Sequence, residues 1–279
     1  MEGGWVLKFK FRNIVVCIVA TLVVDVSAVL AQDEEYLITV MPPGEPTPRL
    51  PNGKPDFTGM WLPNSAGQGV SGRFGVDPEA SRQYDSEVTP EARPQFLPEA
   101  AERIANMSEI ELELSKSSVN CMPRGVPAIW LQNPYGTMLT HKEDVFVQLY
   151  EVLNNFRVIY TDGRPAPEYP EPLFHGNSTT YWEGDTLVVE TTTFDDRTFI
   201  LPNGWYHSDE LKVTERYSRP SENYLIVEVI VDDPQVLATP WESAPRRWTL
   251  TQTPINEFYC TNNQELEELG KLKEQLESE

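Results

Sequence analysis

A histidine and several carboxylates have the residue types that proton-transfer chemistry requires. His207 comes just before a strand-like segment, and Asp195 and Asp196 precede it in the chain. A carboxylate bonded to one ring nitrogen fixes the tautomer of a histidine and makes it a better base. We therefore predict that His207 is the base or acid and that Asp196, or its neighbour Asp195, orients it. A solvated loop histidine is the alternative.

Four charged residues share the spacing of apolar residues in strand-like segments. They are Glu151 after Val145, Val147 and Leu149, Glu215 with Leu211, Val213 and Tyr217, Glu228 with Tyr224, Ile226 and Ile230, and Arg157 with Ile159. If those faces point inward, the charges are buried and need partners. An Arg157–glutamate pair would hold a polar group of a ligand, and Glu151 or Glu215 would be a second proton-transfer group. Outward-facing residues or structural ion pairs are the alternatives.

Aromatic residues gather near the predicted strand ends. They are Tyr181, Trp182, Trp205, Tyr206 and Trp241. Such rings around a barrel mouth suit an apolar or aromatic ligand, or the face of a sugar. His175 lies in a loop before a strand and would add a polar contact to the same ligand. Ordinary core packing of the aromatic residues is the alternative.

Other chemical motifs are missing from the sequence. The three histidines, His141, His175 and His207, do not have the spacing of a zinc site. The chain has no nucleophile-elbow serine, phosphate loop, dinucleotide fingerprint, haem motif or calcium loop. We therefore expect no metal and no other cofactor.

The elements that must position these residues are mainly β-strands. Aromatic and β-branched runs are broken by turns such as Asp162-Gly163 and Gly184-Asp185, a pattern typical of antiparallel hairpins. The predicted strands cover residues 57–62, 145–150, 157–160, 179–183, 186–193, 209–217, 224–231 and 247–253. No helical pattern separates the later strands, which argues against a parallel sheet. We expect a mainly β fold, either an antiparallel barrel, whose closure removes exposed edges, or a sandwich.

The rest of the chain divides by composition. Residues 32–56 are rich in proline and read as an extended lead-in, and a β-rich domain follows over residues 57–262. Within that domain, residues 89–115 have a helical pattern and predict one or two short helices in an elaborated N-terminal half. Residues 263–279 form a charged segment with a leucine stripe and predict a C-terminal helix.

The first 31 residues have the organisation of a secretory signal peptide. Lys8, Lys10 and Arg12 precede an apolar run that ends in small residues at Ala31. The run is short for a membrane-spanning helix and contains Asp25. We expect cleavage after Ala31 and a periplasmic or secreted protein; a retained anchor is the alternative.

Charge and cysteine content fit that location. The chain has 22 basic and 43 acidic side chains and a formal charge of -21, which disfavours binding to nucleic acid. Cleavage would leave two cysteines, Cys121 and Cys260. In an oxidising compartment we expect them to form a disulfide; two unpaired buried thiols are the alternative.

Two resemblances extend this interpretation. Gly59-Met60-Trp61 at the first strand and Arg247-Trp248 on the last resemble the lipocalin/calycin pattern. The resemblance implies a barrel in which Trp61 closes one end and Arg247 packs over it.

Several longer segments resemble those of a family of secreted bacterial proteins. They are Gly53 to Trp61 (GKPDFTGMW), Cys121 to Gly125 (CMPRG), Tyr160 to Arg164 (YTDGR), Trp182 to Val189 (WEGDTLVV) and Glu215 to Tyr217 (ERY). This resemblance implies export and a β-rich body, but no reaction. The chain departs from the family near its end, where Asn262 and Asn263 stand in place of a carboxylate after Cys260-Thr261.

Three functions are compatible with these features. The first is an exported barrel that binds a small, largely apolar or aromatic molecule. The second is a cofactor-independent acid/base enzyme on the same barrel, an isomerase, hydratase or lyase. The third is a structural envelope protein. The first two require that charged and aromatic side chains meet in one place.

Overall fold

One antiparallel β-sheet forms the centre of the computed structural model, which describes residues 44–63, 93–133, 135–258, 260, 270, 271 and 274. Its strands are β1 (Gly59–Pro63), β2 (Thr137–His141), β3 (Val145–Tyr150), β4 (Asn155–Tyr160), β5 (Asn177–Glu183), β6 (Thr186–Thr192), β7 (Lys212–Ser221), β8 (Tyr224–Asp232), β9 (Trp241–Glu242) and β10 (Arg246–Thr251). The spatial order is β4-β3-β2-β1-β10-β8-β7-β6-β5, and β9 pairs with β8.

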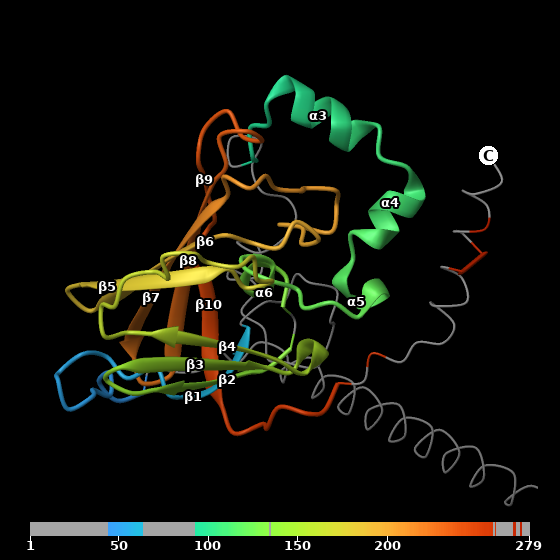
Figure 1. The fold of residues 1–279 in the computed structure, drawn as a ribbon. Helices are drawn as coiled ribbons and strands as arrows, with labels where there is room; N and C mark the ends of the chain where they lie inside the picture. Colours follow the sequence, from blue (N-terminus) through green and yellow to red (C-terminus); the bar gives the residue numbers. More distant parts are fainter. Residues whose placement is uncertain are drawn as a thin grey trace, which may run out of the picture.

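Nine of these strands curl into a nearly closed barrel (Figure 1). The two end strands, β4 and β5, lie side by side, and no backbone ladder joins them within the described residues. Side chains bridge them instead: Thr180 donates to the Tyr160 carbonyl at 2.9 Å, and Arg157 donates to the Ser178 hydroxyl at 2.8 Å. The prediction of a mainly β, antiparallel barrel is confirmed.

Stacked aromatic rings close one end of the barrel. Phe57 stacks on His141 with ring centroids 5.1 Å apart, and Trp182 stacks on Phe57 at 6.0 Å. Lys54 places its ammonium group 5.2 Å from the Trp182 ring centroid on the outside. Trp182 therefore caps this end.

The arginine over Trp61 comes from a different strand than the calycin pattern implies. Arg219 of β7 lies 4.9 Å from the Trp61 ring centroid, whereas Arg247 lies 5.6 Å from Tyr224. Arg219 also donates to the carbonyl oxygens of Asp56, Thr58 and Glu222, so it fixes the chain that enters β1. The expectation for Arg247 is wrong, because these entering carbonyls face β7.

A short helix plugs the other end. All four residues of α6 (Ala128–Leu131) are buried. Trp130 packs edge-on against Tyr150, Tyr217 and Trp248, with ring centroids 6.0, 5.5 and 5.0 Å away. The plug therefore fills the mouth with an indole.

The remaining elements lie outside the barrel. Helices α3 (Pro98–Ala105), α4 (Glu109–Leu114) and α5 (Ser117–Asn120) follow one another along one side, and the short 3-10 turn η2 (Val152–Asn154) links β3 to β4 (Figure 1). Ser108 and Glu111 form a capping box at the start of α4. A disulfide joins Cys121 to Cys260, as predicted. None of the described helices is long and apolar enough to span a bilayer.

Several expectations concern residues outside the described part. These are the signal peptide at residues 1–31, residues 32–43 of the lead-in and almost all of the helix at residues 263–279. Within residues 89–115 the structure has α3 and α4, beginning at Pro98 and Glu109.

Two of the four predicted inward faces point outward. In β3 the buried residues are Phe146, Gln148 and Tyr150, so the face that Glu151 follows lies outside. In β8 the face of Glu228 is outward as well, and Glu228 lies across from Arg216 of β7. The predictions for Arg157 and Glu215 are confirmed, since both are buried inside the barrel.

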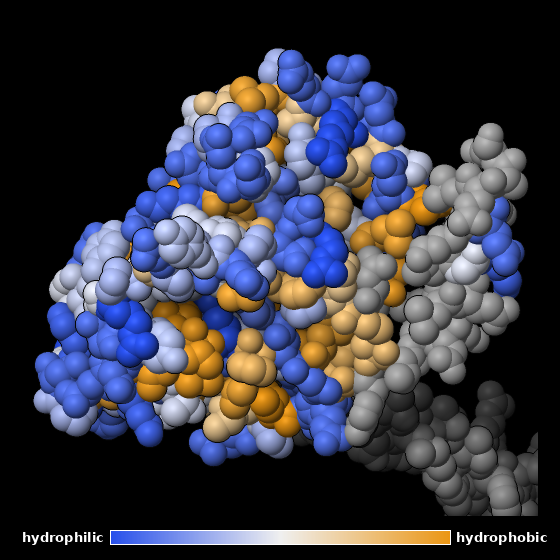
Figure 2. Space-filling model, in the orientation of Figure 1, coloured by the Kyte–Doolittle hydropathy of each residue, from blue (hydrophilic) through white to orange (hydrophobic). Residues whose placement is uncertain are grey.

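The errors have a common physical cause. The outer face of β2–β4 is itself apolar, with Met138, Phe156, Val158 and Tyr160 between 38% and 62% exposed (Figure 2). Because both faces of β3 are apolar, alternation alone does not tell the inner face from the outer one.

Candidate functional site

Arg157 and Glu215 form a buried ion pair inside the barrel. One guanidinium nitrogen, Nη1, donates to both carboxylate oxygens of Glu215, at 3.0 and 2.7 Å. The other, Nη2, donates to the hydroxyls of Ser178 and Thr191, both at 2.8 Å. The side chains of the pair are only 3% and 0% exposed. The pair thus links β4, β5, β6 and β7 across the interior.

Neutral polar groups extend this pair. Tyr217 donates to Glu215 at 2.6 Å, and Gln148 donates to the Tyr217 hydroxyl at 3.0 Å. Tyr150 in turn donates to the Gln148 side-chain oxygen. Burial raises the pKa of both Tyr150 and Tyr217, so both phenols keep their protons and act as donors. Burial acts to lower the pKa of Arg157, but the Glu215 charge, the Tyr217 and Tyr150 hydroxyls and the hydrogen bond to Glu215 together outweigh burial and raise that pKa.

His175 lies at the edge of this network. Its Nε2 is 2.7 Å from the Asn155 side-chain nitrogen, and its ring packs on Tyr150 at 5.8 Å. Burial, helped by the Arg157 charge, lowers the pKa of His175 to about 3. The imidazole is therefore neutral near pH 7.

This network has few groups to offer to a ligand. Both Nη atoms of Arg157 are bonded within the chain, and of its guanidinium only Nε has no partner among the described residues. The geometry favours the alternative that Arg157 and Glu215 form a structural ion pair.

The predicted His207–Asp196 pair is not formed. The two ring nitrogens of His207 lie 2.8 Å from the Ser208 carbonyl and 2.8 Å from the Thr198 hydroxyl. Asp195, the other predicted orienting residue, is bonded to Arg197 at 2.7 Å instead. Local backbone and hydroxyl groups thus take the contacts that we expected a carboxylate to take.

The predicted second proton-transfer groups are also apart. Glu215 is enclosed in the barrel, whereas Glu151 lies at the end of β3 and accepts a hydrogen bond from Asn256 at 3.4 Å. His207 contacts neither of them. The structure therefore does not bring the four predicted catalytic residues into one centre.

The predicted aromatic wall is dispersed as well. Tyr181 points outward and is 45% exposed. Trp205 packs edge-on against Phe96 and Trp241 of β9, and Tyr206 lies under Arg103 of α3. Trp182 belongs to the aromatic cap instead, so the five residues do not form one wall around a ligand.

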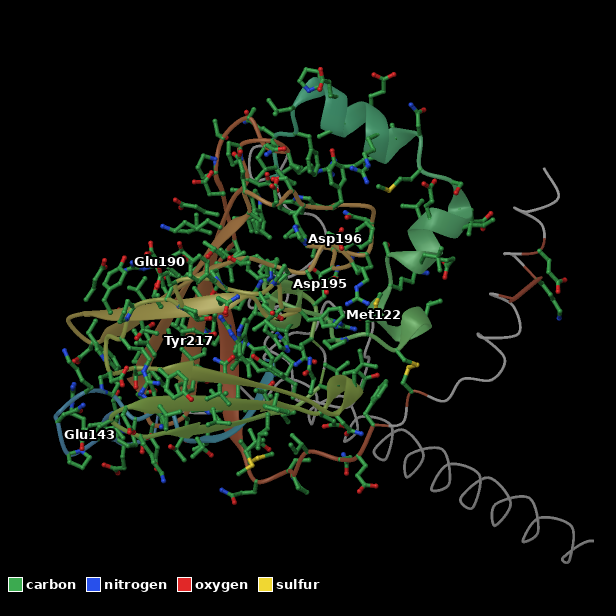
Figure 3. The ribbon with its side chains drawn as sticks, viewed as in Figure 1. Met122, Glu143, Glu190, Asp195, Asp196 and Tyr217 are labelled. Carbon is green, nitrogen blue, oxygen red and sulfur yellow. A yellow bond between two sulfur atoms is a disulfide. The ribbon has the colours of Figure 1, made fainter. Side chains whose placement is uncertain are left out.

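A cavity of about 210 Å³ lies on the outer side of the α6 plug. Ala128 and Gln132 line it, while Trp130 between them packs inside the barrel. The other walls come from residues 114–117 at the junction of α4 and α5, residues 122–124 after the disulfide, and residues 197–202 after β6. In Figure 3, Met122 and Asp195 lie near this end, whereas Tyr217 lies among the strands.

The cavity lining combines apolar and basic residues. The apolar residues are Leu114, Met122, Pro123, Ala128, Phe199 and Pro202. The basic ones are Lys116, Arg124 and Arg197, and no acidic residue is among the lining residues that the structure describes. Thr198, also in the wall, contacts His207, so His207 lies one hydrogen bond behind the cavity.

The sequence prediction missed this cavity. Three separate loops and helix ends build it, and no periodic pattern marks such a place. One signal was present: Arg124 belongs to Cys121-Met122-Pro123-Arg124-Gly125, a segment that carries the resemblance to secreted bacterial proteins.

Comparison with known families, curated proteins and solved structures finds no match for this chain. The resemblances to secreted bacterial proteins and to the calycin pattern therefore stay predictions.

Proposed function

We propose that this protein is an exported β-barrel that binds a small, largely apolar molecule in the cavity beside the α6 plug. The observation that carries the proposal is the cavity itself, about 210 Å³ in volume, with six apolar lining residues and a few polar ones. Concave, mostly apolar sites with a few polar groups are typical ligand sites. The volume is below the roughly 300–1,000 Å³ of drug-sized sites. A molecule with one ring or a short chain suits it.

The barrel supplies the rigid support that such a site needs. Trp130 anchors α6 among Tyr150, Tyr217 and Trp248, and the buried Arg157–Glu215 pair holds the strands behind it. A plug that cannot shift keeps the cavity wall in place, and a preformed site loses less entropy on binding.

Export is part of the proposal. Its support is the signal-like sequence at residues 1–31 and the Cys121–Cys260 disulfide, a bond typical of oxidising compartments. Expression in a Gram-negative host followed by mass spectrometry of the periplasmic fraction tests it. A mature chain that begins at Gln32 is the expected product, and an unprocessed chain in the cytoplasm would contradict export.

Titration with small molecules, followed by two-dimensional NMR, tests ligand binding. A mixture of one-ring and short-chain compounds should shift the amide signals of Met122, Ala128 and Thr198. The variant Ala128→Met fills the cavity and should abolish these shifts. The matched control Ala101→Met adds the same side chain at an exposed position of α3 and should leave them intact. If no compound shifts the cavity amides of the wild type, the binding proposal is wrong.

A further inference from the structure

Arg124 has no carboxylate partner, unlike most arginines whose contacts the structure describes. Arg49, Arg157, Arg164, Arg197 and Arg216 each form an ion pair. Arg124 donates from Nη1 to the carbonyl oxygen of Gln132 at the end of α6, and no described acidic side chain forms an ion pair with it. Among the described residues, its positive charge is therefore left without an ion-pair partner.

Burial makes this lack of a partner costly. Burial lowers the pKa of Arg124, and the side chain of Tyr135 offsets this effect only in part. An arginine keeps its proton at any physiological pH, so the charge persists despite burial. A partly desolvated cation without a counter-charge is unfavourable, and an anion that reaches it recovers part of that cost, less the anion's own loss of hydration.

The other two cations of the cavity are already neutralised. Lys116 pairs with Glu113, and Arg197 pairs with Asp195 at 2.7 Å while stacking over Phe174. Arg124 is thus the basic residue of the described cavity lining that has no ion pair. A ligand with a negative charge would supply that pair.

We propose that the ligand of this cavity is a small monocarboxylate, whose carboxylate binds Arg124 and whose apolar body lies against Met122 and Phe199. This inference rests on the proposed ligand-binding function and names its ligand class. A guanidinium and a carboxylate match in shape and form paired hydrogen bonds. A phosphate would bring close to two negative charges to a site with one to neutralise.

Benzoate and benzamide test the inference, because they have nearly the same shape and differ in charge. In NMR titrations of the oxidised protein, benzoate should bind at least about tenfold more tightly than benzamide, which corresponds to about 1.4 kcal/mol. In Arg124→Gln the preference for benzoate over benzamide should fall to less than about twofold, because the substitution removes the interaction of the guanidinium with the carboxylate charge. Arg124→Lys keeps the charge and should retain part of the preference.

Arg164→Gln is the matched control. Arg164 is exposed, pairs with Asp162 and lies outside the cavity lining, so its loss should leave the preference unchanged. Equal binding of the two probes at the cavity amides would overturn the carboxylate inference and keep the binding function. A preference that survives in a folded Arg124→Gln would also overturn it. No shift with benzoate or benzamide would overturn the carboxylate inference, whereas the binding function fails only if the whole mixture of one-ring and short-chain compounds gives no shift.

Discussion

The buried Arg157–Glu215 pair gives a sharp stability prediction. In Glu215→Leu the guanidinium stays buried without its counter-charge, and the Tyr217 hydroxyl loses its acceptor. Removing one partner of such a pair costs about 3–5 kcal/mol. For a domain of this size, about 2–4 °C per kcal/mol corresponds to a loss of roughly 6–20 °C in Tm.

The double variant Arg157→Met/Glu215→Leu separates pairing from packing. Each single variant leaves a buried charge, whereas the double variant leaves none, and Ser178 and Thr191 can still bond each other at 3.2 Å. The double variant should therefore lose less unfolding free energy than either single variant. The coupling free energy between Arg157 and Glu215 should be at least about 2 kcal/mol. Urea denaturation of all four proteins measures this coupling.

A surface pair serves as the control. Arg216 and Glu183 are 30% and 48% exposed, so Glu183→Gln should cost less than about 1 kcal/mol. The refuting result is additivity: the double variant loses as much unfolding free energy as the two single variants lose together. Arg157 and Glu215 would then not stabilise each other, and their structural role would be wrong.

Three further outcomes follow from single features. Burial lowers the pKa of His141 to about 4 and of His175 to about 3, so neither ring should titrate above pH 5 by NMR. In the unfolded chain these two histidines take up a proton near pH 6.5. The unfolding free energy should therefore fall as the pH drops from about 6.5 to about 4, by about 1.4 kcal/mol per pH unit for each histidine. Removing the disulfide with Cys121→Ser/Cys260→Ser opens a loop of 139 residues and should lower stability in urea by up to about 5 kcal/mol. Gly125→Ala should lower Tm, because φ is +74° there and the added Cβ would lie 2.6 Å from a backbone carbonyl oxygen; an unchanged Tm would contradict this.

The β-strands could be predicted because their signal is local. Aromatic and β-branched runs between turn residues mark β3 to β8 well, since each hairpin forms within a few residues. β2 was missed, because Thr137–His141 mixes polar and apolar residues on both faces. Which face of a strand points inward is harder to predict, because it depends on the elements that pack against that face.

Gln148 and Glu228 illustrate this limit. Gln148 reads as an outward polar residue, yet it is buried, because Tyr150 and Tyr217 satisfy its amide. Glu228 shares the spacing of isoleucines, yet it faces outward opposite Arg216. Polar residues enter a core when partners are available, and those partners lie on other strands.

The same reasoning explains why the sequence drew attention to Arg157 and not to Arg124. A strand alternation marks Arg157 as buried, and burial in a barrel core requires a partner, which Glu215 provides from 58 residues away. Arg124, which is partly buried, lies in a loop with no alternation, so no such pattern in the sequence draws attention to it. A buried cation that its own chain neutralises is available for structure, whereas one that is left unpaired can be neutralised by a ligand. The loops around the plug therefore offer a ligand a charged group, because Arg124 lines the cavity there and has no ion pair among the described residues.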